Sequence, residues 1–276
     1  MRRLRFSCTS LEIRKAVLKS ISRKGVFVLQ ELCSDLFQLL VKRKSVRDFT
    51  QQQVEPEKVQ KIYEAILSSP TTENMMMYSV IRVADKTVCE QLSKQPAIRK
   101  APLVLVFCAD YRRWARIFDA VRPEGRKPEE GEYQLALIDT VIAAQNAVIA
   151  AEALGLSSVY LGDIMEHYED RAHALHLPAG VIPVCTLCIG YGTSQQLARS
   201  KPRRYLQKYL IHEGQYHDVS DAELMEMLRE RGQYQTLEDM QPWLEKFSAR
   251  ATDGKGALER TRSIRAALKA LQTISF

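Results

Sequence analysis

The sequence predicts a single domain of mixed α and β structure, and two observations carry that prediction. Patterns typical of helices and of strands alternate between about residues 56 and 190. A hydrophobic fraction of 46% over 276 residues is enough for one sizeable core. The chain shows no internal repeat and no low-complexity linker that would divide it.

The expected elements follow one another along the chain. Asp35 is the expected N-cap of a short first helix. A second helix begins near Pro56, ends before Pro70, and carries one apolar face formed by Val59, Ile62, Tyr63, Ile66 and Leu67. Strands are expected at residues 78–83, 103–108, 158–161 and 181–189, with helices at 87–93, 133–154 and 168–175.

The C-terminal quarter of the chain differs in character from the rest. Weakly amphipathic helices are expected near residues 221–229 and 256–271, and the segment is too poor in apolar residues for a core of its own. We therefore expect an arm, beginning at about residue 203, that packs on the main body or on a partner subunit.

The net charge of +7 is concentrated at the front of the chain. The first 47 residues hold 12 Lys and Arg against 3 Asp and Glu, which leaves 28 against 30 for the rest. A nucleic-acid-binding face spread over the fold is therefore not expected. We expect residues 1–34 to be a basic extension to a domain at 35–276. Residues 1–24 fit a transit peptide, a misassigned upstream start or a solvated basic helix.

Neither a membrane span nor a metal site is expected. The apolar stretch 133–154 contains Asp139 and Asn146, which favours a core helix. Cys185 and Cys188 lie inside a strand, where buried core thiols are favoured over a redox or zinc pair. The six scattered cysteines fit a reducing compartment, and we expect a cytoplasmic protein.

The segment at residues 43–47 is the first candidate binding site. Arg43, Ser45 and Arg47 are spaced two apart, so an extended chain turns them to one side while Val46 points inward. Two guanidinium groups and a hydroxyl suit a phosphate monoester. The same spacing fits a solvated basic turn, and spacing alone leaves both interpretations open.

Five segments, in this order and spacing, resemble the nitroreductase family. They are RKSVRDF at residues 43–49, SPTTENMMMYS at 69–79, GLSSVYLG at 155–162, VIPVCTLCIGY at 181–191 and KPR at 201–203. The stretch YLIHEGQY at 209–216 resembles the subgroup of oxygen-insensitive NADPH nitroreductases and flavin reductases.

The resemblance implies an α+β fold with a central, mostly antiparallel sheet wrapped by helices. It also implies a homodimer with exchanged C-terminal arms, FMN at each end of the dimer interface, and NADPH or NADH as electron donor. Such an enzyme reduces nitroaromatics, quinones or free flavins by ping-pong hydride transfer, and the flavin carries the chemistry, so no catalytic side chain is expected.

The resemblance further implies which residues bind the cofactor. Its phosphate and ribityl chain would be held by Arg43, Lys44, Ser45, Arg47 and Arg203. Its ring would be lined by Thr71, Thr72, Asn74, Met76 and Gln95, and backed by Tyr160, Leu161, Gly162 and Asp163, with Lys201 near the pyrimidine end.

The chain departs from the family pattern at positions close to the expected ring. Lys44 replaces a usual Arg, Met76 a usual Gln and Asp163 a usual second Gly, while Met165 stands where the subgroup often has Arg. These departures keep open an alternative function, a flavin-binding or flavin-carrier protein without turnover.

Overall fold

The computed structural model describes residues 36–271, so Asp35 lies outside the described residues. The chain divides into two units, residues 1–43 and residues 44–276. In the described part of the first unit, residues 36–42 are helical. The second unit holds all of the elements discussed below.

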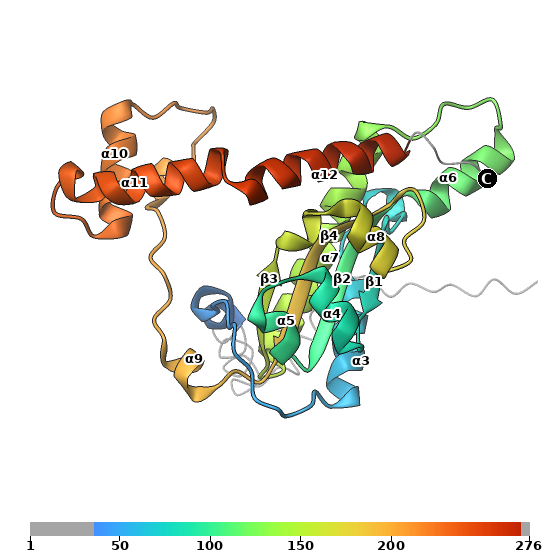
Figure 1. Ribbon diagram of the computed structural model, residues 1–276, viewed down its shortest axis with the longest axis horizontal. Helices are drawn as coiled ribbons and strands as arrows, with labels where there is room; N and C mark the ends of the chain where they lie inside the picture. Colours follow the sequence, from blue (N-terminus) through green and yellow to red (C-terminus); the bar gives the residue numbers. More distant parts are fainter. Residues whose placement is uncertain (1–35, 272–276) are drawn as a thin grey trace, which may run out of the picture. The chain divides into compact units, whose positions relative to one another are not determined.

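A four-stranded antiparallel sheet forms the centre of the second unit, in the order β1-β2-β4-β3 (Figure 1). The strands are β1 (Tyr78–Arg82), β2 (Leu103–Asp110), β3 (Ser157–Leu161) and β4 (Val181–Gly190). β2 and β4 are the two inner strands, and their side chains are almost entirely buried. The expected α+β class with an antiparallel sheet is confirmed.

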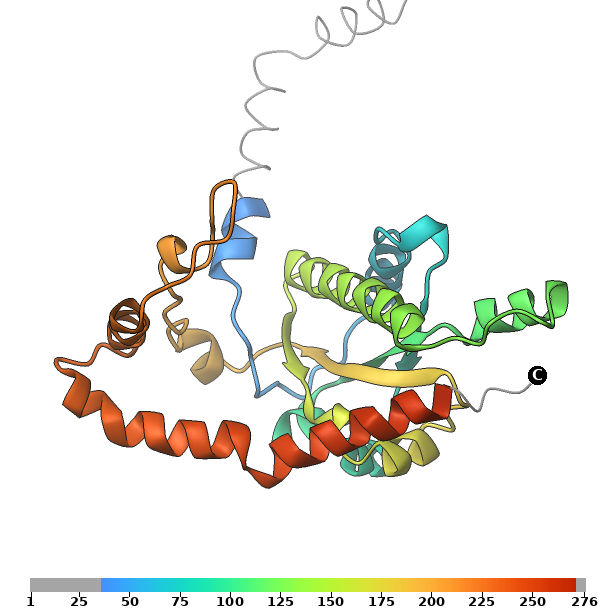
Figure 2. The same ribbon diagram turned by 90° about the horizontal axis from the view of Figure 1, so that it is seen from above.

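Helices cover both faces of this sheet (Figure 2). On one face, α3 (Pro56–Leu67) and α7 (Glu130–Ala153) pack against Leu105, Phe107 and Leu187. The other face is covered by α4 (Lys86–Leu92), α5 (Pro96–Lys100), the 3-10 turn η2 (Asp163–Met165) and α8 (Tyr168–Ala174). Burial on two sides explains why β2 and β4 read as continuous apolar runs.

The long helix α7 presents two apolar faces of different kinds. The face on the sheet is built from small residues such as Ala143, Ala144 and Ala147, which allow close approach. The opposite face exposes Leu135, Ile138 and Val141, each at least 41% exposed. α7 is the one helix among residues 36–271 that is long and apolar enough to cross a membrane, judged by length and composition alone.

The strand predictions are correct to within a few residues at each end, whereas several helices were not expected. These are α5, α6 (Arg112–Val121), α9 (Ser194–Ala198) and α11 (Leu237–Thr252), together with the 3-10 turns η1 (Thr72–Asn74), η2 and η3 (Gln207–Tyr209). Leu67, expected on the buried face of α3, is 62% exposed at the last turn of the helix, so this expectation was wrong.

The C-terminal arm contains α10 (Asp221–Gly232), α11 and α12 (Lys255–Leu271). Ala267 and Leu271 of α12 are buried against Ile182 of β4, so this helix packs on the body of its own chain. In α11, the rings of Trp243 and Phe247 stack with their centroids 5.1 Å apart. Leu224 and Phe247 remain at least 40% exposed.

Cys185 and Cys188 belong to the core, as expected from their place in a strand. Both lie in β4, and burial raises the pKa of each thiol to about 12. A thiol with so high a pKa is a poor nucleophile and a poor metal ligand at neutral pH.

Candidate functional site: a basic pocket and two sheet edges

The residues after Arg43 run in an extended conformation beside β3. Ser45 forms a parallel bridge with Ser158, and the backbone N–H of Val46 donates to the carbonyl oxygen of Ser158 at 3.0 Å. Val46 is 2% exposed, whereas Ser45 and Arg47 are exposed. The expected alternation is therefore confirmed for Ser45, Val46 and Arg47, with Val46 in the core and its two neighbours exposed. It does not extend to Arg43, which is half-buried.

The turn that follows β4 forms the second wall of a pocket next to this segment. Thr50 N–H donates to the Tyr191 carbonyl at 2.8 Å, and Phe49 pairs with Gly192. β4 ends at Gly190, where a Cβ would come within 2.5 Å of Pro102, so only glycine fits. The turn leads directly into α9.

Lys44 links the extended segment to α9 through hydrogen bonds. Its ammonium group donates to the carbonyl oxygen of Leu197 at 2.5 Å and to that of Arg199. Both carbonyls lie at the C-terminal end of α9, where a cation is favoured by the helix dipole. The Arg47 N–H donates to the side-chain oxygen of Gln196 at 3.4 Å.

The result is a cavity of about 310 Å³ whose lining is strongly basic. It is lined by Lys44, Ser45, Arg47, Gln196, Arg199, Ser200, Pro202 and Arg204. Four of these side chains are cations and none is a carboxylate. Guanidinium groups and hydroxyls around a concave site suit a phosphate group.

The sequence prediction and the structure select different arginines for this pocket. Arg203 does not line it, and its guanidinium faces the side-chain amide of Gln233 on the C-terminal arm, at 2.7 Å once the amide oxygen is turned toward it. Arg204 and Arg199 line the pocket instead, while Lys201 is half-buried and also outside the lining. Arg43 belongs to the first unit, where its N–H donates to Leu39.

A second group of expected site residues lies at the far end of β3. Leu161 is buried in the core, Gly162 is exposed, and the Tyr160 hydroxyl lies 3.3 Å from the side-chain oxygen of Gln145 on α7. Gln95 is the exposed N-cap residue of α5. β3 therefore joins the basic pocket at its start to this second group at its end.

Asp163 turns its carboxylate inward from this group. Ser93 donates its hydroxyl to one carboxylate oxygen at 2.6 Å and accepts the backbone N–H of Gln95 at 3.0 Å. The other carboxylate oxygen is buried and makes no hydrogen bond with the described residues. Burial lowers the pKa of the Arg171 guanidinium, and the Asp163 carboxylate opposes that shift.

The third group of expected residues lies in the loop from Thr71 to Met77, between α3 and β1. The hydroxyls of Thr71 and Thr72 are turned toward the buried carboxylate of Asp139 on α7. The side chain of Asn74 is exposed and that of Met76 is half-buried. The sequence predicts that Asp139 lies in a core helix, but nothing in it indicates the contact with Thr71 and Thr72.

The third group and the first two lie on opposite edges of the sheet. The loop leads into β1, whereas the basic pocket and Gly162 are attached to β3, with β2 and β4 between them. Three strand spacings correspond to about 14 Å. One copy of the chain therefore keeps the loop apart from the basic pocket and from Gly162 (Figure 1).

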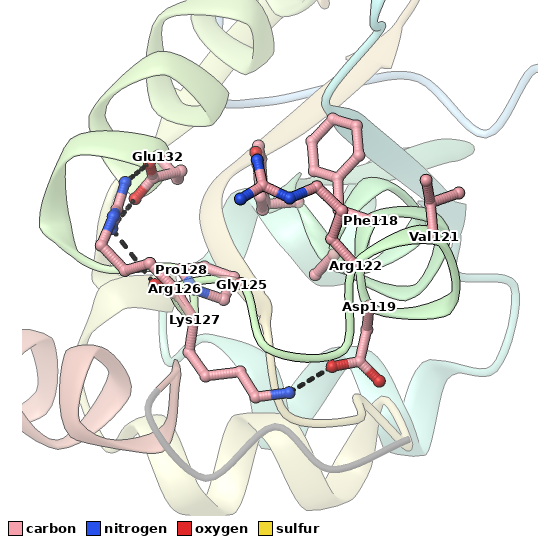
Figure 3. A pocket seen from close by; sticks show the side chains of 11 residues that line it. Phe118, Asp119, Val121, Arg122, Gly125, Arg126, Lys127, Pro128 and Glu132 are labelled. Atoms are coloured by element: carbon pink, nitrogen blue, oxygen red, sulfur yellow. Dashed lines mark hydrogen bonds and ion pairs between the residues drawn. The ribbon is translucent and has the colours of Figure 1, made fainter.

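Another cavity of about 310 Å³ lies between α6 and the start of α7 (Figure 3). Tyr111 and Phe118 are among the residues that line it. Its basic groups face acids: Lys127 pairs with Asp119, and Arg126 pairs with Glu132 and holds the pKa of that carboxyl below its usual value. This cavity is thus less suited to an anion than the pocket beside Lys44.

Comparison with known proteins shows the family to which the chain belongs. The model of the nitroreductase family matches residues 78–191. The oxygen-insensitive NADPH nitroreductase of Salmonella typhimurium is 31% identical over 192 residues, covering 68% of this chain and 77% of that protein. The FMN reductase (NADPH) of Bacillus subtilis is 28% identical over 194 residues, with the same coverage of both chains.

Solved structures share the fold. A Bacteroides fragilis protein superposes with a TM-score of 0.73 at 25% identity and covers 86% of this chain and 98% of its own. The NADPH:FMN oxidoreductase of Vibrio harveyi complexed with NAD+ gives a TM-score of 0.64 at 22% identity, covering 76% of this chain and 96% of its own.

The antiparallel sheet, the helices on its two faces and the basic pocket at the start of β3 define an α+β protein with a basic cavity beside one edge strand. The chain belongs to the nitroreductase family.

Proposed function

We propose that this protein is an NAD(P)H-dependent flavin oxidoreductase that holds the phosphate of FMN in the basic pocket. The observation that carries the proposal is the cavity lined by four cations and no carboxylate, in a chain of the nitroreductase family. Relatives named NADPH nitroreductase, FMN reductase and NADPH-flavin oxidoreductase support both the cofactor and the electron donor.

The residues of the pocket fit an FMN phosphate. Arg47, Arg199 and Arg204 would contact its oxygens, while Lys44, already bonded to α9, adds charge and fixes the wall. The rest of the cofactor would run along β3 toward Gly162 and Gln95, which are both exposed. Gly162 has no side chain, so a flat ring could lie against it. Bound FMN would supply the redox chemistry, hydride transfer from the nicotinamide and electron transfer to an acceptor. The protein itself would only need to bind and orient the cofactor, the electron donor and the acceptor.

The acceptor belongs to the same proposal. Nitroaromatics, quinones and free flavins are planar molecules that can stack in one broad pocket, so each qualifies. Donor and acceptor would use this pocket in turn, which predicts ping-pong kinetics. We place the enzyme in the cytoplasm, because its six scattered cysteines fit a reducing compartment.

We further propose that the enzyme is a homodimer in which each cofactor site is shared. The exposed apolar face of α7 at Leu135, Ile138 and Val141 needs a partner surface, and Leu67 of α3, a helix that packs on α7, is also exposed. The loop on the β1 edge can reach a cofactor on the β3 edge of a second copy, though not that of its own. Exchange of C-terminal arms remains a proposal for the segment before α12, since α12 packs on its own chain.

The first test is an absorption spectrum of the purified protein. We expect a yellow protein that releases intact FMN on denaturation and is bleached by anaerobic NADPH or NADH. Steady-state NADPH oxidation with a quinone separates this proposal from the alternative of a flavin carrier. A protein that is bleached only over hours and turns over no acceptor supports the carrier; a colourless protein that ignores added FMN contradicts both.

The carrier alternative rests on Asp163 and Met76, and the effect of the Asp163 charge can be tested by potentiometry. Asp163→Asn keeps the contact with Ser93 but removes a negative charge close to the expected ring. If the carboxylate lies about 10 Å from the ring, its interaction with a charge on the ring would be worth about 1.7 kcal/mol at an effective dielectric constant near 20. We therefore expect the midpoint potential of bound FMN to rise by roughly 20 to 40 mV.

Ser93→Ala is the matched control, because it removes the hydrogen bond and leaves the charge in place. We expect a smaller change of potential in this variant. Equal potentials for Asp163→Asn and the unmodified protein would show that Asp163 is electrically remote from the flavin.

A further inference from the structure

The loop from Thr71 to Met77 has an unusual backbone. Glu73, Asn74 and Met76 have φ values of 49°, 59° and 49°, in the left-handed region that favours glycine. Three such residues within four positions, none of them glycine, do not hold this conformation by local preference. The surrounding structure must therefore hold the loop.

Asp139 supplies the acceptors that hold it. This residue lies in the middle of α7 and is 1% exposed. One carboxylate oxygen accepts the backbone N–H of Thr72 at 3.1 Å and its hydroxyl at 3.3 Å. The other accepts the N–H of Met77 at 3.2 Å and the hydroxyl of Thr71. The four hydrogen bonds use both oxygens and all come from the loop.

Thr71 connects one further residue of the loop, Met76, to Asp139. Its hydroxyl donates to Asp139 and accepts the backbone N–H of Met76 at 2.8 Å. The N–H groups of Thr72, Met76 and Met77 are thus all directed, directly or through one hydroxyl, toward a single buried carboxylate.

Donors on α6 hold the carbonyl side of the same loop. Arg113 donates to the carbonyl oxygens of Met76 and Tyr78, each at 2.8 Å, and the Trp114 indole N–H donates to Met75 at 2.7 Å. Arg113 is itself paired with Asp110 at 2.6 Å. The loop is therefore fixed between an acceptor on α7 and donors on α6, and the side chains of Glu73 and Asn74 are left exposed.

We propose that Asp139 is a positioning residue of the cofactor site, which acts by fixing the loop from Thr71 to Met77 in the conformation that meets FMN. This inference rests on the proposed function, because it takes the loop to be one wall of the flavin site. It also changes the roles of Thr71 and Thr72, which the resemblance places against the flavin ring. Their hydroxyls donate to Asp139 and are not directed at the ligand.

A carboxylate is required at this position. An asparagine has one acceptor oxygen, and its NH2 group would face either the N–H of Met77 or that of Thr72. A buried donor left facing another donor is costly, so the loop is expected to move away. Asp139→Asn is therefore a small change in shape with a specific effect on the loop.

The experiment compares Asp139→Asn with Thr140→Val in the full-length protein. Thr140 is the next residue of α7 and is equally buried. Among residues 36–271, its hydroxyl donates only to the Ala136 carbonyl of the same helix, at 2.6 Å. Two quantities are measured: the FMN dissociation constant, and amide hydrogen exchange of the FMN-free protein. In Asp139→Asn we expect FMN affinity to fall by about tenfold to a hundredfold. The amides of Thr72, Met76 and Met77 should exchange at least about tenfold faster, whereas those of β2 keep their rates.

A second pair of variants covers the case in which Asp139→Asn does not fold. Thr71→Val removes the relaying hydroxyl at nearly constant shape, and Thr71→Ser restores it. We expect Thr71→Val to speed exchange at Met76 and to weaken FMN binding, and Thr71→Ser to recover both.

The outcomes separate the two proposals. If the unmodified protein binds no FMN, the proposed function fails, while exchange in the FMN-free protein still tests the hold on the loop. Unchanged exchange in the loop overturns the inference. So does faster exchange with unchanged FMN affinity, or an equal effect of Thr140→Val.

Discussion

Replacing Arg47 and Arg204 together by alanine is expected to weaken FMN binding by about two to four orders of magnitude. Each guanidinium would make a charge-assisted contact with the phosphate, worth about 1.5 to 3 kcal/mol. The two side chains come from different walls of the pocket, the extended segment beside β3 and the chain after α9, so we expect their effects to add.

Riboflavin and Arg203 provide the controls for this measurement. Riboflavin lacks the phosphate, so its affinity should change little in the double variant. Arg203→Ala should retain FMN binding, because its guanidinium faces Gln233 and not the pocket. A double variant with unchanged FMN affinity would place the phosphate elsewhere. A large loss in Arg203→Ala would favour the assignment made from the family resemblance.

The strands and the longest helix could be predicted because their sequence signals are strong. β2 and β4 are continuous apolar runs, and α7 is apolar over nearly its whole length. α11 has no such signal, because Pro242 lies inside it and most of its surface is polar. α5 and α9, with five residues each, are too short to show a period.

The candidate site was predictable only where its residues are close in sequence. Two-residue spacing showed that Ser45 and Arg47 face one side, since that depends on strand geometry alone. The contact between Asp139 and Thr72 joins residues 67 positions apart. Such a contact depends on how α7 lies on the sheet, and in the sequence Asp139 appears only as a polar residue within an apolar helix.

A mixed dimer should recover FMN binding that both of its parent variants have lost. One subunit carries Arg47→Ala with Arg204→Ala, which damages the basic pocket. The other carries Asp139→Asn, which releases the loop on the β1 edge. If each cofactor site combines the pocket of one copy with the loop of the other, the mixed dimer contains one site with both halves intact and one with both halves damaged.

The expected result is therefore one FMN per mixed dimer, at an FMN concentration where neither parent binds appreciably. The two subunits can be given different affinity tags, purified by both tags in sequence, and titrated with FMN by fluorescence quenching. The unmodified dimer, treated in the same way, should bind two.

The stoichiometry distinguishes shared sites from sites within one chain. If each site lay within a single chain, every site in the mixed dimer would carry one of the two defects, and binding would stay as weak as in the parents. Opposite edges of a four-stranded sheet carry the two halves. In the proposed homodimer, a two-fold axis would bring the β1 edge of one chain to the β3 edge of the other at both sites equally. A binding curve with no tight class in the mixed dimer, from subunits that still associate, would show that the loop serves its own chain.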